Sequence, residues 1–139
     1  MIPDWVAPFV GIPWLEKGRD HEGADCWGVL RLAMREHFGV DLPSYGEDYD
    51  DLTDGAKITA LLRQGIPSGG WRQVTDPREG DGVVLRIIGP LELHVGLVVA
   101  PGLFLHALEK YGGSAVERLD HPMWAHRILG YYRHPEVSV

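Results

Sequence analysis

Residues 93–108 have the sequence LHVGLVVAPGLFLHAL, which is the pattern of a β-hairpin. Two apolar runs, Leu93–Val99 and Leu103–Leu108, flank a Pro-Gly turn. Because side chains alternate between the two faces of a strand, His94 lies on the face opposite to the odd-numbered residues of the first run. His106 lies in the second run. A hairpin that joins the two strands therefore brings both imidazole rings close together on one face.

Three further segments also look like strands and are bounded by turn residues: Gly82–Ile88, Ala115–Leu119 and Arg127–Arg133. The part of the chain before them has helical character, apart from an irregular segment of about twenty residues at the start that is dense in Pro and Gly. Helices followed by consecutive short strands predict an α+β fold with an antiparallel sheet.

The clearest helical pattern covers about residues 25–38. Asp25 precedes it, Gly39 supplies a stop, and His37 in the last turn suits the helix dipole. A second, shorter helix is expected to end near Gly65, followed by a loop to Gly70. The apolar residues that give the two patterns are Cys26, Val29, Leu30, Ala33, Met34 and Phe38 in the first, and Ile58, Leu61 and Leu62 in the second.

The composition is that of an ordinary globular protein, with 45% hydrophobic and 24% charged residues. A chain of 139 residues is long enough to bury a core, so we expect one domain over residues 1–139. Lys and Arg number 13 against 20 Asp and Glu, a net charge of −7. This acidic balance argues against a nucleic-acid partner, because such proteins usually carry clustered basic residues.

The chain also lacks the sequence features of membrane insertion and secretion. Apolar runs such as Val95–Val99 are too short to span a bilayer. The N-terminus lacks the basic and apolar segments of a signal peptide, so we expect synthesis in the cytoplasm. Cys26 is the single cysteine, and the fold therefore has no intrachain disulfide.

Cys26 falls in the first turn of the predicted helix, and this position suggests a nucleophile. Unpaired backbone N–H groups and the helix dipole stabilise a thiolate there, so we expect its pKa to be lowered toward neutrality. A cysteine nucleophile needs a base within hydrogen-bond reach, and the base needs a third group to fix its tautomer. Cys26, His94 and His106 have the side-chain types for these three roles.

Two other interpretations of the same residues stand beside the catalytic one. Cys26 can be a small apolar core residue, the usual role of a free cysteine, and each histidine can be a buried residue with satisfied hydrogen bonds. One cysteine and two histidines can also bind zinc, but the chain lacks close-set ligand pairs such as C-x-x-C or H-E-x-x-H. We therefore expect no metal and no cofactor.

Five short motifs occur in an order that resembles one known family. They are Gly11-Ile12-Pro13-Trp14, Asp25-Cys26-Trp27-Gly28-Val29, Gly80-Asp81-Gly82-Val83-Val84, His94-Val95-Gly96 and Leu105-His106-Ala107. Over residues 10–133 the chain resembles the NlpC-type cell-wall peptidases, a papain-like cysteine peptidase family. The resemblance implies a papain-like α+β fold with N-terminal helices packed on a central antiparallel sheet. The D-C-W-G form, with Leu42-Pro43 after the helix, looks most like the branch in phage and gene-transfer-agent tail modules.

The resemblance also implies an activity and assigns roles to residues. The activity is hydrolysis of an amide in the peptide stem of peptidoglycan, commonly the bond between γ-D-glutamyl and a diamino acid. By matching position, Cys26 is the nucleophile, His94 the base and His106 the orienting residue. Asp25 matches an acidic residue that helps to recognise the substrate's amine in some members. A tail-module protein of this kind acts at the cell wall from the virion, beside other tail or tail-tip proteins.

Two tryptophans depart from the family pattern and are candidates for substrate binding. Trp14 stands where many members have Tyr, and it can wall a pocket but offers no hydroxyl. Trp27 stands where many members have Ser, and its bulk reshapes the cleft. The alternative function is a non-catalytic tail-assembly or adaptor protein that keeps the fold and uses its Trp-rich N-terminal segment for binding.

Overall fold

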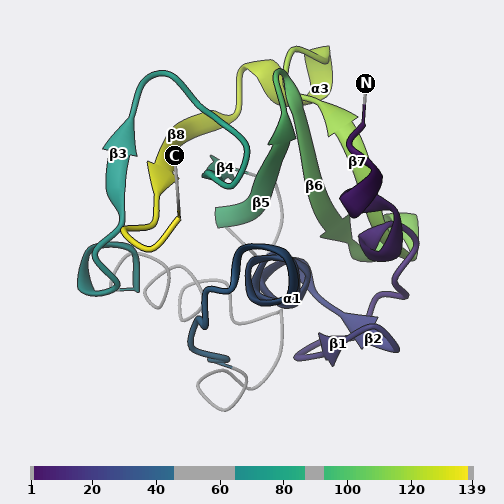
Figure 1. Ribbon diagram of the computed structural model, residues 1–139. Helices are drawn as coiled ribbons and strands as arrows, with labels where there is room; N and C mark the ends of the chain where they lie inside the picture. The colour runs from purple at the N-terminus through teal and green to yellow at the C-terminus, as the bar shows by residue number, and fades with distance from the viewer. Residues whose placement is uncertain (1, 46–64, 87–92, 138–139) are drawn as a thin grey trace.

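The computed structural model describes residues 2–45, 65–86 and 93–137 (Figure 1). In chain order its named elements are η1 (Asp4–Phe9), β1 (Arg19–Asp20), β2 (Gly23–Ala24), α1 (Cys26–Phe38), β3 (Arg72–Val74), β4 (Gly82–Arg86), β5 (Leu93–Ala100), β6 (Leu103–Leu108), η2 (Glu109–Tyr111), β7 (Gly113–Arg118), α3 (Pro122–Ala125) and β8 (Ile128–Arg133).

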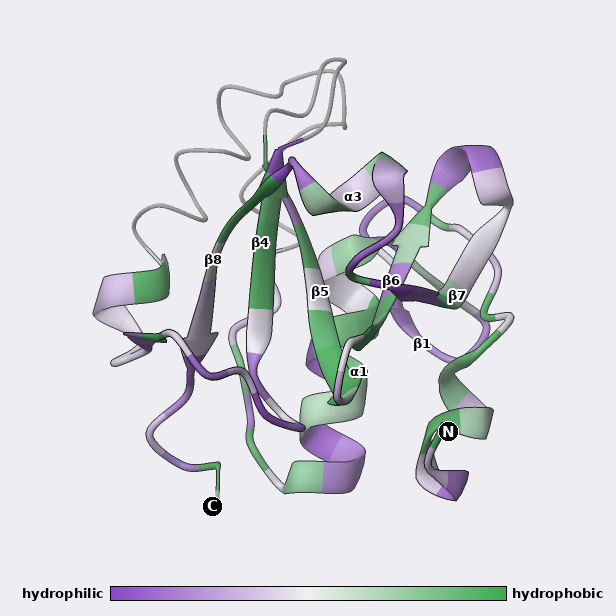
Figure 2. Ribbon diagram, turned by 90° about the horizontal axis from the view of Figure 1, so that it is seen from above, coloured by the Kyte–Doolittle hydropathy of each residue, from purple (hydrophilic) through white to green (hydrophobic). Residues whose placement is uncertain are grey.

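Among the described residues, six strands form one sheet in the order β3-β8-β4-β5-β6-β7, and every neighbouring pair is antiparallel. The predicted α+β fold with an antiparallel sheet is confirmed. β5 lies inside the sheet between β4 and β6, and all of its residues are buried. A strand buried on both faces reads as a nearly continuous apolar run, which explains the green colour of most of β5 in Figure 2.

The helix α1 begins and ends at the residues that the sequence indicates. The Asp25 side chain accepts a hydrogen bond from Gly28 N and caps the first turn, and Gly39 ends the helix in the left-handed conformation at φ 69°. The apolar face of α1 packs against β5 and β6 in the main core cluster. This cluster includes the odd-numbered residues Leu93, Val95, Leu97 and Val99 of β5.

A second cluster covers the opposite face of the same strands. Its largest member is Trp124 of α3, which is 1% exposed. Figure 1 shows α1 below and α3 above the paired strands β5 and β6. Val98 belongs to this second cluster, as the alternation along β5 requires. The remaining buried members are Val83, Leu85, Phe104, Leu108 and Leu119.

The five predicted strands are present, with small differences at their ends. β5 and β6 match the prediction to within one residue, β7 begins two residues earlier than expected, and β8 begins at Ile128. The end predicted for the first strand, at Ile88, lies outside the described residues. The short elements η1, β1, β2, β3, η2 and α3 were not predicted, because two to six residues are too few for a periodic pattern.

Two sequence-based predictions concern the segment before β3. The apolar residues Ile58, Leu61 and Leu62 of the predicted second helix lie outside the described residues. The predicted loop from Gly65 to Gly70 is wrong in its first part, because residues 65–68 are helical and only 69–70 form a turn. In the part of the chain that the structure describes, no helix has the length and apolar character needed to cross a membrane.

Candidate active site

Cys26 is the first residue of α1, directly after the capping Asp25. It is 6% exposed and belongs to the main core cluster. Backbone N–H groups of Val95 and Trp27 interact with its thiol. The sulfur therefore lies beside β5, against the residue that directly follows His94 in the chain.

The expected lowering of the Cys26 pKa is wrong for the protein without substrate. Burial raises the pKa of the thiol to about 12, and the negative charge of Asp25 adds to the rise, while the two N–H groups and Arg19 act in the opposite direction. Desolvation of a thiolate at an enclosed position outweighs the stabilisation by the helix start. The resting thiol is therefore protonated at neutral pH.

His94 and His106 are brought together as the hairpin pattern predicts. Nε2 of His94 lies 2.8 Å from Nδ1 of His106, within hydrogen-bond distance. Both residues are buried, at 1% and 0% exposure. The ring of Trp124 packs against both imidazoles, and Phe104 stacks on His106 with 4.3 Å between the ring centroids. The hydrogen bond engages Nε2 of His94, so Nδ1 is the other nitrogen of this ring.

The two imidazoles are neutral at physiological pH. Burial lowers the pKa of His94 well below its usual value, and His106 lowers it further, while the charge of Glu117 acts in the opposite direction. Burial lowers the pKa of His106 to about 3. A neutral imidazole and a neutral thiol are the protonation states from which general-base catalysis starts, because the proton moves only as the sulfur attacks.

Strands β5 and β6 pair only over part of their length, and the histidines lie beyond the paired part. The ladder runs from Ala100 and Leu103 to Leu97 and Leu105, and His94 and His106 are outside it. Gly96 lets the strands come close here, because a Cβ on it would lie 2.7 Å from the Phe104 ring and 3.0 Å from the Leu105 carbonyl oxygen. The H-V-G motif thus contains both a candidate base and the glycine that makes room for its partner strand.

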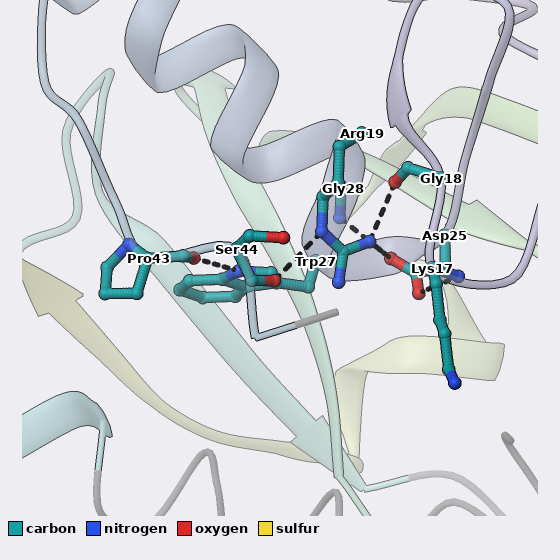
Figure 3. A network of polar contacts seen from close by, with 8 residues as sticks. All are labelled: Lys17, Gly18, Arg19, Asp25, Trp27, Gly28, Pro43 and Ser44. Carbon is teal, nitrogen blue, oxygen red and sulfur yellow. Dashed lines mark hydrogen bonds and ion pairs between the residues drawn. The ribbon is translucent and has the colours of Figure 1, made fainter. Parts of the chain in front are cut away.

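Asp25 is the centre of a polar network at the start of α1, shown in Figure 3. Its Oδ1 accepts hydrogen bonds from Gly28 N at 2.9 Å and Arg19 Nη1 at 2.8 Å, and its Oδ2 accepts from Lys17 N at 2.9 Å. The same Arg19 donates through Nε to the carbonyl of Ser44. With 1% exposure, Asp25 fixes the helix start between two loops.

Gly28 of the D-C-W-G motif is needed for this packing. A Cβ on Gly28 would lie 2.1 Å from the carbonyl oxygen of Gly18, which accepts a hydrogen bond from Arg19 Nη1 at 2.7 Å. The motif therefore combines a cap, a candidate nucleophile and a close backbone contact within four residues. Sequence reasoning missed Arg19, because its role depends on a loop fold that has no periodic signal.

The two tryptophans predicted near the substrate are half-buried at different places. Trp27 donates from Nε1 to the carbonyl of Pro43 at 2.8 Å and packs against Tyr45 at 5.3 Å between ring centroids. It lines an apolar cavity of about 30 Å³, together with Leu30, Tyr45, Gly65, Ile66, Trp71, Gly82, Val83, Val84, Val95 and Tyr132. Trp14 forms a parallel bridge with Ala24, two residues before Cys26.

Within residues 2–45, 65–86 and 93–137, the His, Cys, Asp and Glu side chains do not gather into a group of three or more that suits a metal ion.

Sequence reasoning also missed Glu117 of β7, whose Oε2 lies 3.4 Å from Nε2 of His106. Only the pairing of β7 with β6 places it there.

Comparison with known proteins assigns the chain to a family. The model of the NlpC/P60 family matches residues 11–133, which is most of the chain. The chain belongs to the NlpC/P60 family. Members of this family are cysteine peptidases and peptidoglycan hydrolases, and the recognition made from the five motifs is confirmed.

Two curated relatives illustrate the similarity in sequence. The murein DD-endopeptidase/LD-carboxypeptidase MepS of Escherichia coli K12 is 26% identical over 91% of this chain and 57% of its own length. The tail tip assembly protein K of Escherichia phage N15 is 24% identical over 95% of this chain and 54% of its own. The chain thus spans about half the length of these relatives.

The crystal structure of the NlpC/p60 domain of the peptidoglycan hydrolase SagA has the same fold. Its TM-score is 0.57 at 20% sequence identity, and the match covers 97% of this chain and 96% of that domain. The papain-like arrangement of a helix on a central antiparallel sheet is therefore confirmed for the described residues.

Proposed function

We propose that residues 1–139 form a single cysteine endopeptidase domain that hydrolyses an amide bond in the peptide stem of bacterial peptidoglycan. The observations that carry the proposal are the hydrogen-bonded pair of His94 and His106 and the Cys26 thiol, which interacts with the backbone N–H of Val95, the residue after His94. Membership of the NlpC/P60 family supplies the substrate class.

In the proposed mechanism each of the three residues has one task. Nδ1 of His94 takes the proton of the Cys26 thiol as the sulfur attacks the amide carbonyl, and a thioester forms. The new imidazolium then protonates the leaving amine, and water hydrolyses the thioester. The role of His106 is to hold the His94 ring with Nδ1 toward the sulfur, through the 2.8 Å hydrogen bond to Nε2.

The neutral resting state fits this order of events. The raised pKa of Cys26 and the lowered pKa of His94 place the proton on sulfur until a substrate carbonyl arrives. Backbone N–H groups in the first turn of α1, that of Cys26 included, are suited to hold the oxyanion of the tetrahedral intermediate. The Gly28 N–H is not available for this task, because Asp25 caps it.

Asp25, Trp14 and Trp27 are proposed to shape the substrate cleft. The carboxylate of Asp25 already accepts three hydrogen bonds, so its effect on a substrate amine is chiefly that of a fixed negative charge. Trp27 and its apolar cavity provide an aromatic wall next to Val95. A bond between γ-D-glutamyl and a diamino acid is the proposed cleavage site within the stem.

We further propose that the protein acts from a phage or gene-transfer-agent tail and contacts other tail or tail-tip proteins. The similarity to the tail tip assembly protein K of phage N15 supports this place of action. A non-catalytic role in tail assembly is the alternative, and the experiment below separates the two.

The test is digestion of purified peptidoglycan by the wild-type protein and four variants, with released fragments identified by mass spectrometry. Cys26→Ala is expected to lower the rate by at least about 10³-fold and His94→Ala by about 10²–10⁴-fold. His106→Ala is expected to cause a smaller loss, because orientation contributes less than proton transfer. His126→Ala, at an exposed histidine, is the matched control and is expected to be active.

The masses of the released fragments identify the bond that is cleaved. Equal digestion by the wild-type protein and by Cys26→Ala would overturn the peptidase assignment. Failure of both to digest any peptidoglycan, at normal folding, would favour the tail-assembly role.

A further inference from the structure

Nε2 of His106 is a buried polar atom without a hydrogen bond that meets normal distance limits. The nearest charged group is the carboxylate of Glu117, with Oε2 at 3.4 Å. Buried polar groups in proteins are nearly always paired, so an orphaned ring nitrogen aimed at a carboxylate calls for an explanation. The contact is a few tenths of an ångström too long for a strong hydrogen bond and can tighten when the ring pair becomes charged.

The position of Glu117 follows from the sheet. It lies in β7 opposite Phe104 of β6, and Phe104 and His106 are two residues apart on one face of that strand. The carboxylate therefore projects on the same side as the histidine pair. Its side chain is 25% exposed, so Glu117 lies between the buried imidazoles and solvent.

Two neighbouring side chains hold the Glu117 carboxylate in place. Trp124 of α3, itself buried, donates from Nε1 to the same oxygen that faces His106. The hydroxyl of Tyr111 in η2 also interacts with Glu117, and it lies 3.6 Å from Sδ of Met123. Burial and the interaction with Glu117 together raise the pKa of Tyr111 to about 12, as expected for a hydroxyl close to a negative charge.

A fixed carboxylate determines where the protons of both imidazoles lie. A ring nitrogen that faces a carboxylate oxygen is stable only as N–H, because two lone pairs repel, so His106 carries its proton on Nε2. Nδ1 of His106 is then an acceptor, and His94 must donate to it from Nε2. His94 then has its lone pair on Nδ1, and this tautomer can accept the Cys26 proton.

We propose that Glu117 is a positioning residue of the active site, which selects the tautomers of His106 and His94 and stabilises the positive charge that the pair takes up during catalysis. This inference rests on the proposed function of Cys26 and His94. In the step concerned, the S–H bond of Cys26 breaks and an N–H bond forms at Nδ1 of His94. The proton later passes from Nδ1 to the leaving amine, and no proton moves to Glu117.

The charge of Glu117 has the sign that this role requires. It raises the pKa of His94, whereas burial and His106 lower it. Without Glu117, His94 is a weaker base and its imidazolium lies without a counter-charge in an enclosed site.

The test compares Glu117→Gln, Glu117→Ala and the control Glu109→Gln, which removes the same charge from an exposed residue of η2. Gln keeps an amide oxygen for Trp124 and His106 but carries no charge. Ala has neither the side-chain oxygen nor the charge. The first readout is the nitrogen NMR spectrum of the histidine rings in the protein without substrate, with His94 and His106 assigned from His94→Asn and His106→Asn variants. The wild-type protein is expected to show both rings protonated on Nε2 alone, and Glu117→Ala a mixture of tautomers.

The second readout is the pH dependence of peptidoglycan cleavage. Glu117→Gln is expected to lower kcat at neutral pH about tenfold and to move the acid limb to lower pH by about one unit, since the pKa of His94 falls. A purely structural defect would lower the rate of cleavage at every pH and leave the pH of the acid limb unchanged. Glu109→Gln is expected to match the wild type in both readouts.

The two readouts separate a failure of this inference from a failure of the proposed function. If the wild-type protein cleaves no peptidoglycan, the tautomers still test Glu117, because they need no substrate. Unchanged tautomers in Glu117→Ala, or an unmoved acid limb in a folded Glu117→Gln, would overturn the role of Glu117. Thermal unfolding of each variant establishes that it is folded, and Glu117→Gln carries the test if Glu117→Ala does not fold.

Discussion

His94 and His106 share one hydrogen bond, 2.8 Å from Nε2 to Nδ1, and the protein encloses both rings almost completely. Two imidazoles in such contact cannot both be charged, and burial disfavours even one charge. The pair is therefore neutral at rest and takes up one extra proton only briefly during catalysis. This relationship has consequences for stability as well as for catalysis.

The first prediction is that the protein loses stability in acid because of the histidine pair. The pKa of His106 is about 3 in the folded protein and about 6.5 in the unfolded chain, and the pKa of His94 is lowered in the same direction. Between these values the unfolded chain binds more protons, so stability is complete above about pH 6.5 and falls as the pH drops toward 3. Each histidine contributes up to about 1.4 kcal/mol per pH unit.

Urea unfolding at several pH values between 7 and 4 measures this dependence. The slope is expected to become shallower in His106→Gln, which removes one titrating ring, and to stay the same in His126→Gln at an exposed position. An equal slope in the wild-type protein and His106→Gln would contradict the neutral buried state of His106.

The second prediction concerns the reactivity of Cys26. Because burial and the charge of Asp25 raise the pKa of its thiol to about 12, the rate of alkylation by iodoacetamide is expected to increase with pH up to at least pH 10, with no plateau near neutrality. Cys26 is the single cysteine, so mass spectrometry of the intact protein follows the reaction without ambiguity.

Asp25→Asn tests the electrostatic part of this prediction. Asn keeps a side-chain oxygen for the helix cap but has no charge, so the pKa of Cys26 falls and alkylation at pH 8 accelerates several-fold. Asp41→Asn is the control, because that carboxylate is 88% exposed and lies beyond the other end of α1. A plateau near pH 7 in the wild-type protein would mean that the thiolate is already formed at rest.

These two predictions show where sequence reasoning about the site succeeded and where it failed. The period-two pattern of residues 93–108 was enough to place His94 and His106 on one face, because the alternation and the turn are local features. Asp25 and Gly39 set the bounds of α1 for the same reason. The pKa of Cys26 was misjudged because a helix start is visible in sequence, whereas the burial that outweighs it depends on the packed β5 and β6.

Glu117 shows a different limit of sequence reasoning. Nothing near it in the chain marks it, since it occurs in an ordinary strand pattern, between Val116 and Arg118. Its position depends on the register of β7 against β6 and on Trp124 of the short helix α3, which has no periodic signal. Residues that act through the pairing of distant segments are therefore visible only once the sheet is assembled.

The third prediction is that Gly96 is required for the geometry of the histidine pair. A Cβ in Gly96→Ala would lie 2.7 Å from the Phe104 ring and 3.3 Å from the Cβ of His106, so β6 must shift. We expect a loss of stability of about 1–3 kcal/mol from overpacking, and a loss of cleavage in the molecules that are still folded.

Gly102→Ala is the matched control for Gly96→Ala. Gly102 lies in the hairpin turn at φ 75° with open space around the position of a Cβ, so its cost is about 1 kcal/mol from backbone strain alone. Cleavage by folded Gly102→Ala is expected to match the wild type. Normal cleavage by Gly96→Ala would mean that the close approach of β5 and β6 does not set the position of His106.

The fourth prediction compares two carboxylate–arginine pairs that have the same chemistry and opposite burial. Asp81 is fully buried and accepts hydrogen bonds from Nε and Nη2 of Arg133, both at 2.7 Å, and from the backbone N–H of Arg78. Asp120 accepts from Nε and Nη2 of Arg118 at 2.9 and 2.8 Å, but both side chains are about 70% exposed.

Asp81→Asn is expected to lower the free energy of unfolding by about 3–5 kcal/mol, because it leaves the buried guanidinium of Arg133 without its counter-charge. Asp120→Asn is expected to have no measurable effect, since water screens the exposed pair. Urea unfolding of the two variants at pH 7 gives both values. The backbone carbonyl of Asp81 also accepts from Val98 N of β5, so the Gly-Asp motif before β4 ties Arg133 of β8 to the strand that carries His94. Equal losses in the two variants would mean that burial does not determine the strength of these pairs, and that the motif has no special structural role.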